Sequence, residues 1–247
     1  MKKRHAATFG LVVLCLVCAV PAIAASHWGY SGEFGPENWH KADPGYALCN
    51  SGKNQTPINI EPQYKTTLPP IKLAYTHKGQ SLVNNGHSIE VQFPPHNTMT
   101  VGKQTFTLVQ AHFHAPSENL LNGKSYPMEG HFVHKDDKGH LAVLAVFYEE
   151  GAENPHMATL WKSMPHKAGE SVHLPGDGFD GRGILPAKLD YIYFNGSLTT
   201  PPCSEGVRWY VLKKAQTVSR QQVEKFTGII GVNNRPLQPV NARPVLE

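Results

Sequence analysis

The sequence lacks the basic clusters that nucleic-acid binding requires. Of its 23 lysine and arginine residues, three stand at the very start, as Lys2, Lys3 and Arg4. Without them the formal charge falls from +4 to +1, because 20 basic residues then face 19 acidic ones. No basic run interleaved with aromatic residues remains, so we expect no nucleic-acid partner.

A membrane span is also missing beyond the N-terminus. The longest later apolar run, residues 141–148, has only the length of a strand, whereas a spanning helix needs about 18 or more apolar residues. The N-terminus combines its positive flank with a short apolar stretch that ends in Ala22-Ile23-Ala24. This pattern predicts a cleaved secretory signal peptide at residues 1–24, rather than a core helix or a lipoprotein leader. The exported domain is then residues 25–247, without a membrane span, in the periplasm or, alternatively, secreted.

Cysteine is scarce, and half of it belongs to the predicted signal peptide. Cys15 and Cys18 leave with that peptide, so Cys49 and Cys203 remain. In an oxidising compartment a disulfide is the favoured state, with two free thiols as the alternative. Such a bridge would close a loop of more than 100 residues and add up to about 5 kcal/mol to stability in the chain-entropy model.

Helix signals are few, and short strand-like stretches separated by Gly, Pro and Asn dominate. We therefore predict a β-rich fold with one core. The predicted strands are residues 71–75, 87–93, 105–114, 129–134, 141–148, 191–194 and 207–213. Two helices are predicted, a surface helix at residues 154–164 capped by Asn154 and one at residues 219–228 with a Ser219–Gln222 capping box and a stop at Gly228.

Two histidines share one face of the strand predicted at residues 105–114. Because strand side chains alternate, His112 and His114 fall on the same face as Phe106, Leu108 and Gln110. Their Cα atoms would lie about 7 Å apart, close enough for both rings to reach one ion. Exposed histidines have the same spacing, so a metal site needs a third ligand.

His131 can supply that ligand if the strand at residues 129–134 pairs with the first. Glu129, His131 and Val133 share a face, and His134 points to the other. Three neutral imidazoles leave one tetrahedral position open, which is typical of catalytic zinc. Gln110 and Glu129, each two residues before a histidine, are suited to accept the second ring N–H.

These residues belong to a longer series of motifs. The series includes Gln110-Ala-His112-Phe-His114, Glu118, Glu129-Gly-His131 and Gly196-Ser-Leu-Thr199-Thr200-Pro-Pro202. Supporting segments are His27-Trp28-Gly29-Tyr30, Asn54-Gln55-Thr56-Pro57-Ile58-Asn59-Ile60, Asn84-Asn85-Gly86-His87, Val207-Arg208-Trp209 and Asn234-Arg235-Pro236-Leu237-Gln238-Pro239. In their order, over residues 27–239, they resemble the exported α-class carbonic anhydrases of bacteria.

The resemblance implies a mainly β fold: a single domain around a large, twisted, mostly antiparallel sheet with a few short peripheral helices. It implies one Zn²⁺ per chain at the bottom of a conical cleft and the reversible hydration of carbon dioxide to bicarbonate. It also implies a disulfide between Cys49 and Cys203 that tethers the N-terminal region beside the Thr199 loop. The oligomeric state stays open, with a homodimer as one alternative.

The resemblance assigns a role to each residue around the metal. His112, His114 and His131 are the implied ligands, supported by Gln110, Glu129 and the backbone carbonyl of Asn233. Thr199 is implied to accept a hydrogen bond from the metal-bound hydroxide and to donate its own proton to Glu118, which aims the hydroxide at carbon.

Substrate and proton handling are implied further from the metal. The positions that match the substrate site are Val133, Val143, Leu198, Thr199, Thr200, Val207 and Trp209, with core packing as the alternative for the apolar ones. His87 matches the proton shuttle, and Tyr30 and Asn85 match positions that order water. Strict alternation would group His87 with Ile89 and Val91, a conflict that a strand start or bulge would remove.

Two departures and two rival hypotheses accompany the resemblance. Glu90 stands where the best-known members carry a neutral amide, and Phe194 where some carry tyrosine. A cupin-like enzyme would use iron or manganese with Glu118 as a ligand, but Phe106 and Ser125 occupy positions where cupins expect glycine. A carbonic-anhydrase-like binding module without catalysis is the second rival.

Overall fold

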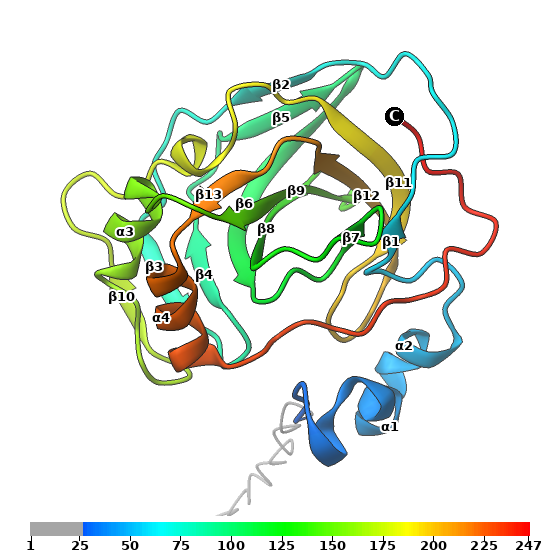
Figure 1. The fold of residues 1–247 in the computed structure, drawn as a ribbon, viewed down its shortest axis with the longest axis horizontal. Helices are drawn as coiled ribbons and strands as arrows, with labels where there is room; N and C mark the ends of the chain where they lie inside the picture. Colours follow the sequence, from blue (N-terminus) through cyan, green and yellow to red (C-terminus); the bar gives the residue numbers. More distant parts are fainter. Residues whose placement is uncertain (1–26) are drawn as a thin grey trace, which may run out of the picture.

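The structure is a computed structural model in which residues 27–247 are described. Eleven of its strands form one large sheet (Figure 1). These strands are β2 (Ile71–Ala74), β3 (Ser81–Asn84), β4 (Ile89–Gln92), β5 (Thr98–Val101), β6 (Gln104–His114), β8 (Met128–Lys135), β9 (Leu141–Glu150), β10 (Ser171–His173), β11 (Tyr191–Ser197), β12 (Glu205–Leu212) and β13 (Gln216–Val218). The predicted signal peptide lies outside the described residues.

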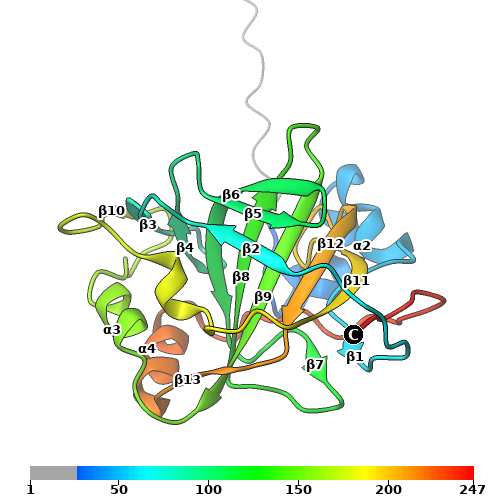
Figure 2. The ribbon, with the colours of Figure 1, turned by 90° about the horizontal axis from the view of Figure 1, so that it is seen from above.

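The sheet is mixed but mostly antiparallel. Its main order is β10-β3-β4-β6-β8-β9-β12-β11, with β5 also on β6, β2 on β5 and β13 on β9. Only the pairings of β9 with β12 and β13 are parallel within this sheet. Figure 2 shows β8 and β9 through the centre of the molecule with β12 at an angle to them. β1 (Asn59–Ile60) and β7 (Leu120–Leu121) form a separate parallel pair. The predicted fold class is therefore confirmed.

The helices are short and peripheral. They are α1 (Trp39–Ala42), α2 (Leu48–Ser51), α3 (Pro155–Trp161), α4 (Arg220–Ile230) and the 3-10 helices η1 (Gly32–Phe34), η2 (Pro36–Asn38), η3 (Pro44–Tyr46) and η4 (Gly181–Ile184). In the part of the chain that the structure describes, no helix combines the length and apolar composition needed to cross a bilayer.

Both predicted helices form, with a correction at the C-terminal end of each: α3 ends at Trp161, before the predicted residue 164. The Asn154 side chain accepts hydrogen bonds from two backbone N–H groups at the start of α3, and the Ser219–Gln222 capping box is complete at the start of α4. The prediction that Gly228 ends α4 is wrong. The helix continues to Ile230 and stops at Gly231, whose φ of 81° suits a glycine.

All seven predicted strands are present, each with ends within three residues of the prediction. The strands that the sequence did not predict (β1, β3, β5, β7, β10 and β13) have at most four residues each. An alternating pattern of that length is too short to distinguish a strand from a loop.

A β-bulge in β6 changes which side chains share a face of this strand, so the predicted grouping of Phe106 and Leu108 with the two histidines is wrong. The register with β8 shifts between Leu108 and Gln110, and the intervening Val109 is exposed. Phe106 and Leu108 therefore pack in the main core with Ala111 and Phe113, not on the face of the two histidines. One extra residue reverses the faces because the side-chain period of a strand is two.

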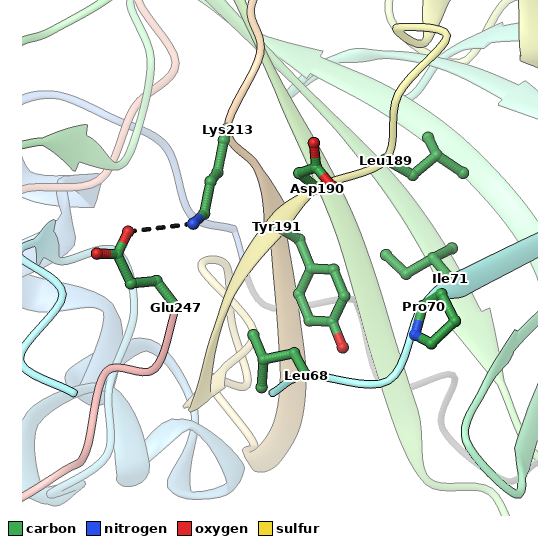
Figure 3. Close-up of a pocket in the computed structure, with 8 residues that line it drawn as sticks. All are labelled: Leu68, Pro70, Ile71, Leu189, Asp190, Tyr191, Lys213 and Glu247. Carbon is green, nitrogen blue, oxygen red and sulfur yellow. Dashed lines mark hydrogen bonds and ion pairs between the residues drawn. The ribbon is translucent and has the colours of Figure 1, made fainter. Parts of the chain in front are cut away.

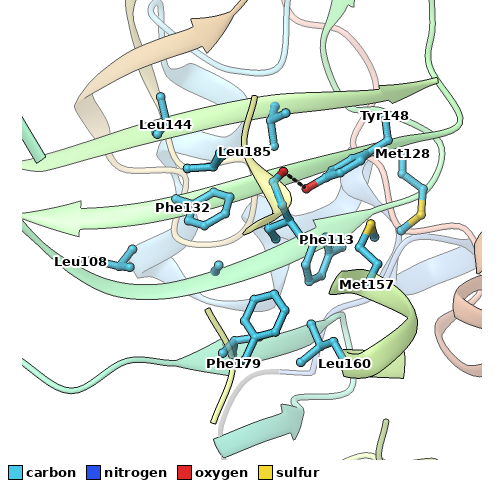
Figure 4. Packing of buried hydrophobic residues seen from close by; sticks show 14 of the residues in the cluster. Leu108, Phe113, Met128, Phe132, Leu144, Tyr148, Met157, Leu160, Phe179 and Leu185 are labelled. Atoms are coloured by element: carbon cyan, nitrogen blue, oxygen red, sulfur yellow. Dashed lines mark hydrogen bonds between the residues drawn. The ribbon is translucent and has the colours of Figure 1, made fainter. Parts of the chain in front are cut away.

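Two apolar layers cover the two faces of the sheet. The larger layer, packed partly under α3, includes Phe113, Phe132, Leu144 and Met157 (Figure 4). The smaller layer on the opposite face includes Val143, Phe147, Val207 and Trp209. β9 is buried on both sides because its successive side chains enter alternate layers.

A histidine is also buried outside the metal-ligand candidates. His134 is on the core side of β8, with Nδ1 2.8 Å from the carbonyl oxygen of Phe132 and Nε2 2.7 Å from the hydroxyl of Tyr75. A carbonyl can only accept, so Nδ1 carries the proton and Nε2 accepts from Tyr75. Burial lowers the pKa of His134 to about 4, so the ring is neutral at physiological pH.

We predict that His134 makes the fold sensitive to acid. Its folded pKa lies below its unfolded value, so the unfolded chain binds more protons and stability falls as the pH drops from about 6.5 towards 4. Between pH 7 and 4.5 the wild type should lose about 2 to 3 kcal/mol more unfolding free energy than His134→Gln. Urea titrations at both pH values measure this difference, and identical losses would contradict it.

Candidate metal centre

Three histidines converge from two adjacent strands. His112 and His114 extend from β6, and His131 extends from β8 as the cross-strand partner of His112. One ring nitrogen from each lies within 4.8 Å of the others. Within residues 27–247, this is the one group of three or more histidine, cysteine or acidic side chains placed to hold a metal ion. The strand pairing on which the third ligand depended is thus present.

The remaining ring nitrogens face oxygen acceptors. His112 Nδ1 lies 2.7 Å from Oε1 of Gln110, and His114 Nδ1 lies 2.7 Å from the backbone oxygen of Asn233. Because both oxygens can only accept, Nδ1 of each ring carries the proton. Nε2 of each ring therefore keeps a lone pair that can coordinate a metal ion. His131 Nε2 lies 3.0 Å from Oε1 of Glu129, although the contact is not aligned as a hydrogen bond, and its Nδ1 faces the other histidines.

The three imidazoles are neutral. Burial lowers the pKa of all three, well below the usual value for His112 and His131, and neighbouring imidazoles lower those two further. Nε2 of His114 is buried without a hydrogen-bond partner. A neutral nitrogen with a free lone pair in a polar cluster is the state in which histidine binds metal.

A buried amide holds the carboxylate beside His131, and sequence reasoning missed it. Asn119 donates from Nδ2 to Oε1 of Glu129 at 2.8 Å and from its backbone N–H to Oε2 at 2.8 Å. The Asn119 Oδ1 accepts from the backbone N–H of Ile58 at 3.0 Å. Burial raises the pKa of Glu129 to about 7, against the opposing effect of these hydrogen bonds. No pattern marks Asn119, because its partners lie on separate segments.

Glu118 and Thr199 meet behind the histidines. The Thr199 side chain hydrogen-bonds to Glu118, whose Oε1 accepts from the backbone N–H of Arg235 at 3.0 Å. Oε2 of Glu118 lies 3.4 Å from Nε2 of His114. Burial raises the pKa of Glu118 to about 8 despite the hydrogen bond from Thr199. The structure therefore brings together the two residues that the resemblance pairs.

The disulfide implied by the resemblance is present between Cys49 and Cys203. Beside it, the buried guanidinium of Arg235 donates to the Cys49 carbonyl at 2.8 Å and to Gln55 Oε1 at 2.9 Å. Gln55 in turn donates from Nε2 to the Cys203 carbonyl at 3.0 Å. The bridge and Arg235 thus fasten the N-terminal region to the loop that follows Thr199, a function of Arg235 that the sequence did not reveal.

The histidines open into a cleft with a volume of about 200 Å³. Its lining residues are Trp28, Tyr30, Asn85, His87, Ser88, Glu90, Gln110, His112, His114 and Thr200. His87 precedes β4, so the strand begins after it and the conflict with alternation disappears. Its ring stacks on Trp28 with 3.6 Å between centroids, and its backbone N–H donates to Oδ1 of Asn85 at 2.9 Å. The hydroxyl of Tyr30 is buried without a hydrogen-bond partner.

The apolar positions that the resemblance assigns to the substrate site lie in or against the smaller apolar layer. Val143, Val207 and Trp209 are buried in the smaller apolar layer, and Val133 and Leu198 pack against it. The Trp209 ring meets the His131 ring edge-on, with 5.0 Å between centroids. Phe194 is buried and stacks on Trp209, so this position serves packing.

A larger surface pocket lies elsewhere and shares no lining residue with the cleft. It has a volume of about 430 Å³ and lies between Leu68, Ile71, Leu189 and Tyr191, with Lys213 and Glu247 at its edge (Figure 3). Lys213 Nζ and Glu247 Oε2 are 3.1 Å apart and partly exposed. The three-histidine group therefore does not lie in the larger of these two pockets.

The comparisons with known proteins agree with this geometry. Residues 34–247 match the family model of eukaryotic-type carbonic anhydrase. The carbonic anhydrase of Pectobacterium carotovorum is 44% identical over 240 residues, covering 96% of this chain and 97% of that protein. The carbonic anhydrase of Neisseria gonorrhoeae is 46% identical over 242 residues, covering 95% of each.

Solved structures show the same fold. The α-carbonic anhydrase from Thermovibrio ammonificans, in complex with the inhibitor sulfanilamide, superposes with a TM-score of 0.88 at 47% identity, covering 91% of this chain and 100% of that one. For the Photobacterium profundum α-carbonic anhydrase the TM-score is 0.85 at 49% identity, with coverage of 90% and 100%. Fold, cleft and relatives together define a lyase that hydrates carbon dioxide. This chain belongs to the eukaryotic-type, or α, carbonic anhydrase family.

Membership in this family excludes the cupin hypothesis. Glu118 lies outside the three-histidine group and instead binds Thr199 and the backbone of Arg235. The full-length matches are to carbonic anhydrases.

We predict that Asn119 is required for stability. Asn119→Ala leaves the buried N–H of Ile58 and Oε1 of Glu129 without their partner, which should lower the unfolding free energy by about 2 to 5 kcal/mol. Asn50→Ala, at an exposed position in α2, is the control and should change it by less than about 0.5 kcal/mol. Equal urea midpoints for the two variants would contradict the role of Asn119.

Proposed function

We propose that this chain is a zinc-dependent carbonic anhydrase that reversibly hydrates carbon dioxide to bicarbonate and a proton. In this proposal His112, His114 and His131 hold one Zn²⁺ per chain. The observation that carries it is the set of three neutral ring nitrogens within 4.8 Å of one another, with an oxygen close to the other nitrogen of each ring.

The donor set fits zinc. Three neutral imidazoles are a common catalytic zinc set and leave the fourth tetrahedral position open. Bound there, zinc would lower the pKa of a coordinated water to about 7, a value for which carbonic anhydrases are themselves the reference case. Gln110, Glu129 and the carbonyl of Asn233 would keep the rings in the binding tautomer.

Thr199 and Glu118 would orient the attacking oxygen. Glu118 is held by the backbone N–H of Arg235, so its carboxylate has little freedom to turn. A Thr199 hydroxyl that donates to this carboxylate keeps its oxygen available to accept from the nucleophile. Such positioning aligns the attacking oxygen before the reaction, so the hydration step no longer carries that entropy cost.

The apolar side of the cleft would receive the substrate. Carbon dioxide is small and carries no net charge, so it gains little from polar groups and binds against side chains that exclude water. Val133, Val143, Leu198, Val207 and Trp209 would provide that wall, because they belong to or pack against the layer whose Trp209 ring meets the His131 ring. Thr199 and Thr200 would form its polar edge, and Thr200 lines the cleft. These seven positions are the proposed substrate site.

His87 would return the product proton to solvent. An acid of pKa about 7 that loses its proton to water alone supports only about 10³ turnovers per second, so faster cycling needs a shuttle. His87 lines the cleft and is partly exposed; burial, and then the charge of His27, lower its pKa below the usual value. Tyr30 and Asn85 would order the intervening water, although Oδ1 of Asn85 also accepts from two backbone N–H groups.

Export is part of the proposal. Residues 1–24 would be a cleaved signal peptide, and residues 25–247 the catalytic domain in the periplasm, with secretion as the alternative. The disulfide between Cys49 and Cys203 supports an oxidising compartment.

The first test is the metal content of the leaderless protein together with stopped-flow hydration of carbon dioxide. We expect about one zinc per chain and activity that chelation removes and added zinc restores. His131→Ala should lose zinc at neutral pH because two imidazoles remain. Bound zinc without hydration would favour a binding module, and His131→Ala with normal zinc would remove His131 from the ligand set.

A second test concerns the shuttle. His87→Ala should lower kcat by about tenfold or more in dilute buffer, leave kcat/KM for carbon dioxide nearly unchanged, and recover partly with added imidazole. His77→Ala, at an exposed histidine outside the cleft, is the control and should behave as the wild type. Turnover of His87→Ala equal to wild type at every buffer concentration would refute the shuttle.

A further inference from the structure

Glu90 is the one carboxylate among the described residues that line the cleft. The other nine lining residues are aromatic, hydroxyl, amide or imidazole side chains, and none is lysine or arginine. The cleft therefore carries a negative charge in its wall with no fixed positive side chain beside it. The metal would lie at the inner end of the same cavity, because His112 and His114 also line it.

The sheet fixes the location of this charge. Glu90 is on β4, where its neighbours Ile89 and Val91 are fully buried in the main core. Alternation therefore turns Glu90 to the cleft side. Its cross-strand partner on β6 is the metal-ligand candidate His112. The backbone ladder thus holds Glu90 one strand away from the metal centre.

No basic side chain pairs with the carboxylate; burial raises its pKa above the usual value, and two amide hydrogen bonds oppose that rise. Gln92 Nε2 donates to Oε1 at 3.4 Å, and the Asn85 amide is the other polar partner. No described lysine or arginine lies within ion-pair distance of it. The titratable groups that face the cleft with it are Tyr30, His87, His112 and His114, and burial keeps the imidazoles neutral at neutral pH.

We propose that Glu90 is a specificity-determining residue that weakens the binding of anions at the metal. Its negative charge repels inorganic anions and the bicarbonate product, whereas uncharged carbon dioxide is unaffected. This inference rests on the proposed function, because it requires a metal held by the three histidines. It assigns a function to Glu90, which is a carboxylate at a position where the best-known members of the family carry a neutral amide.

The expected size follows from Coulomb's law. Cross-strand neighbours have Cβ atoms about 5 Å apart, so the carboxylate and a metal-bound anion would lie roughly 8 to 10 Å apart. With an effective dielectric constant of about 40 to 80 in a water-filled cleft, removal of the charge should tighten anion binding by about two- to sixfold. Salt should reduce the difference, because the Debye length is about 8 Å at physiological ionic strength.

The test is a titration of thiocyanate against protein loaded with Co²⁺, followed by the visible absorption of the metal. It compares the wild type with Glu90→Gln, which keeps the shape and removes the charge, and with Glu90→Asp, which keeps the charge. Glu153→Gln, at an exposed position beside α3, controls for the loss of one negative charge from the whole protein. Titration with uncharged 1,2,4-triazole controls for changes in the metal site itself.

We expect Glu90→Gln to lower the Kd for thiocyanate by about two- to sixfold at low ionic strength, and by less at high ionic strength. Glu90→Asp and Glu153→Gln should bind thiocyanate as the wild type does, and all four proteins should bind triazole equally. Equal thiocyanate affinity in the wild type and Glu90→Gln would overturn this inference alone. Failure of every variant to bind Co²⁺ would instead overturn the proposed function.

Discussion

The pairing of β6 with β8 is the constraint on which the metal centre depends. It sets His112 opposite His131 and His114 opposite Glu129. The bulge at Val109 determines which face of β6 these histidines occupy, because side chains reverse at each step along a strand. Without the extra residue, either the histidines or Phe106 and Leu108 would point to the wrong side. Because of this one register shift, β6 can place Phe106 and Leu108 in the core and its histidines in the cleft.

Around this ladder the protein buries ionisable groups that would be costly if left alone. Glu118, Glu129 and Arg235 are almost completely inaccessible. Glu129 and Arg235 each make several hydrogen bonds with other segments, which offset the loss of hydration, and Oε1 of Glu118 accepts from the backbone of Arg235 while its Oε2 has no partner. The same hydrogen bonds limit the rotation of these groups. They therefore both stabilise the fold and fix the orientation of the site residues. The disulfide extends this network to the N-terminal segment.

The cleft itself is electrostatically asymmetric. Its lining holds imidazoles with free lone pairs, one carboxylate and no lysine or arginine. Such a lining favours a cation at the imidazoles and disfavours anions near Glu90. This distribution of charge follows from the alternation of β4 and β6, which turns Glu90 and His112 into the same space.

The sequence by itself determined the long strands, the helix starts and the candidate ligands, because alternation, capping residues and motif order are local signals. It also indicated the disulfide, since the cysteines outside the predicted signal peptide number only two. Only the tertiary structure decided the bulge at Val109, the extension of α4 beyond Gly228, and the functions of Asn119 and Arg235. The functions of Asn119 and Arg235 depend on contacts between segments up to 186 residues apart, such as Arg235 with Cys49. Such contacts arise from packing and backbone hydrogen bonding in three dimensions, which leave no periodic trace along the chain.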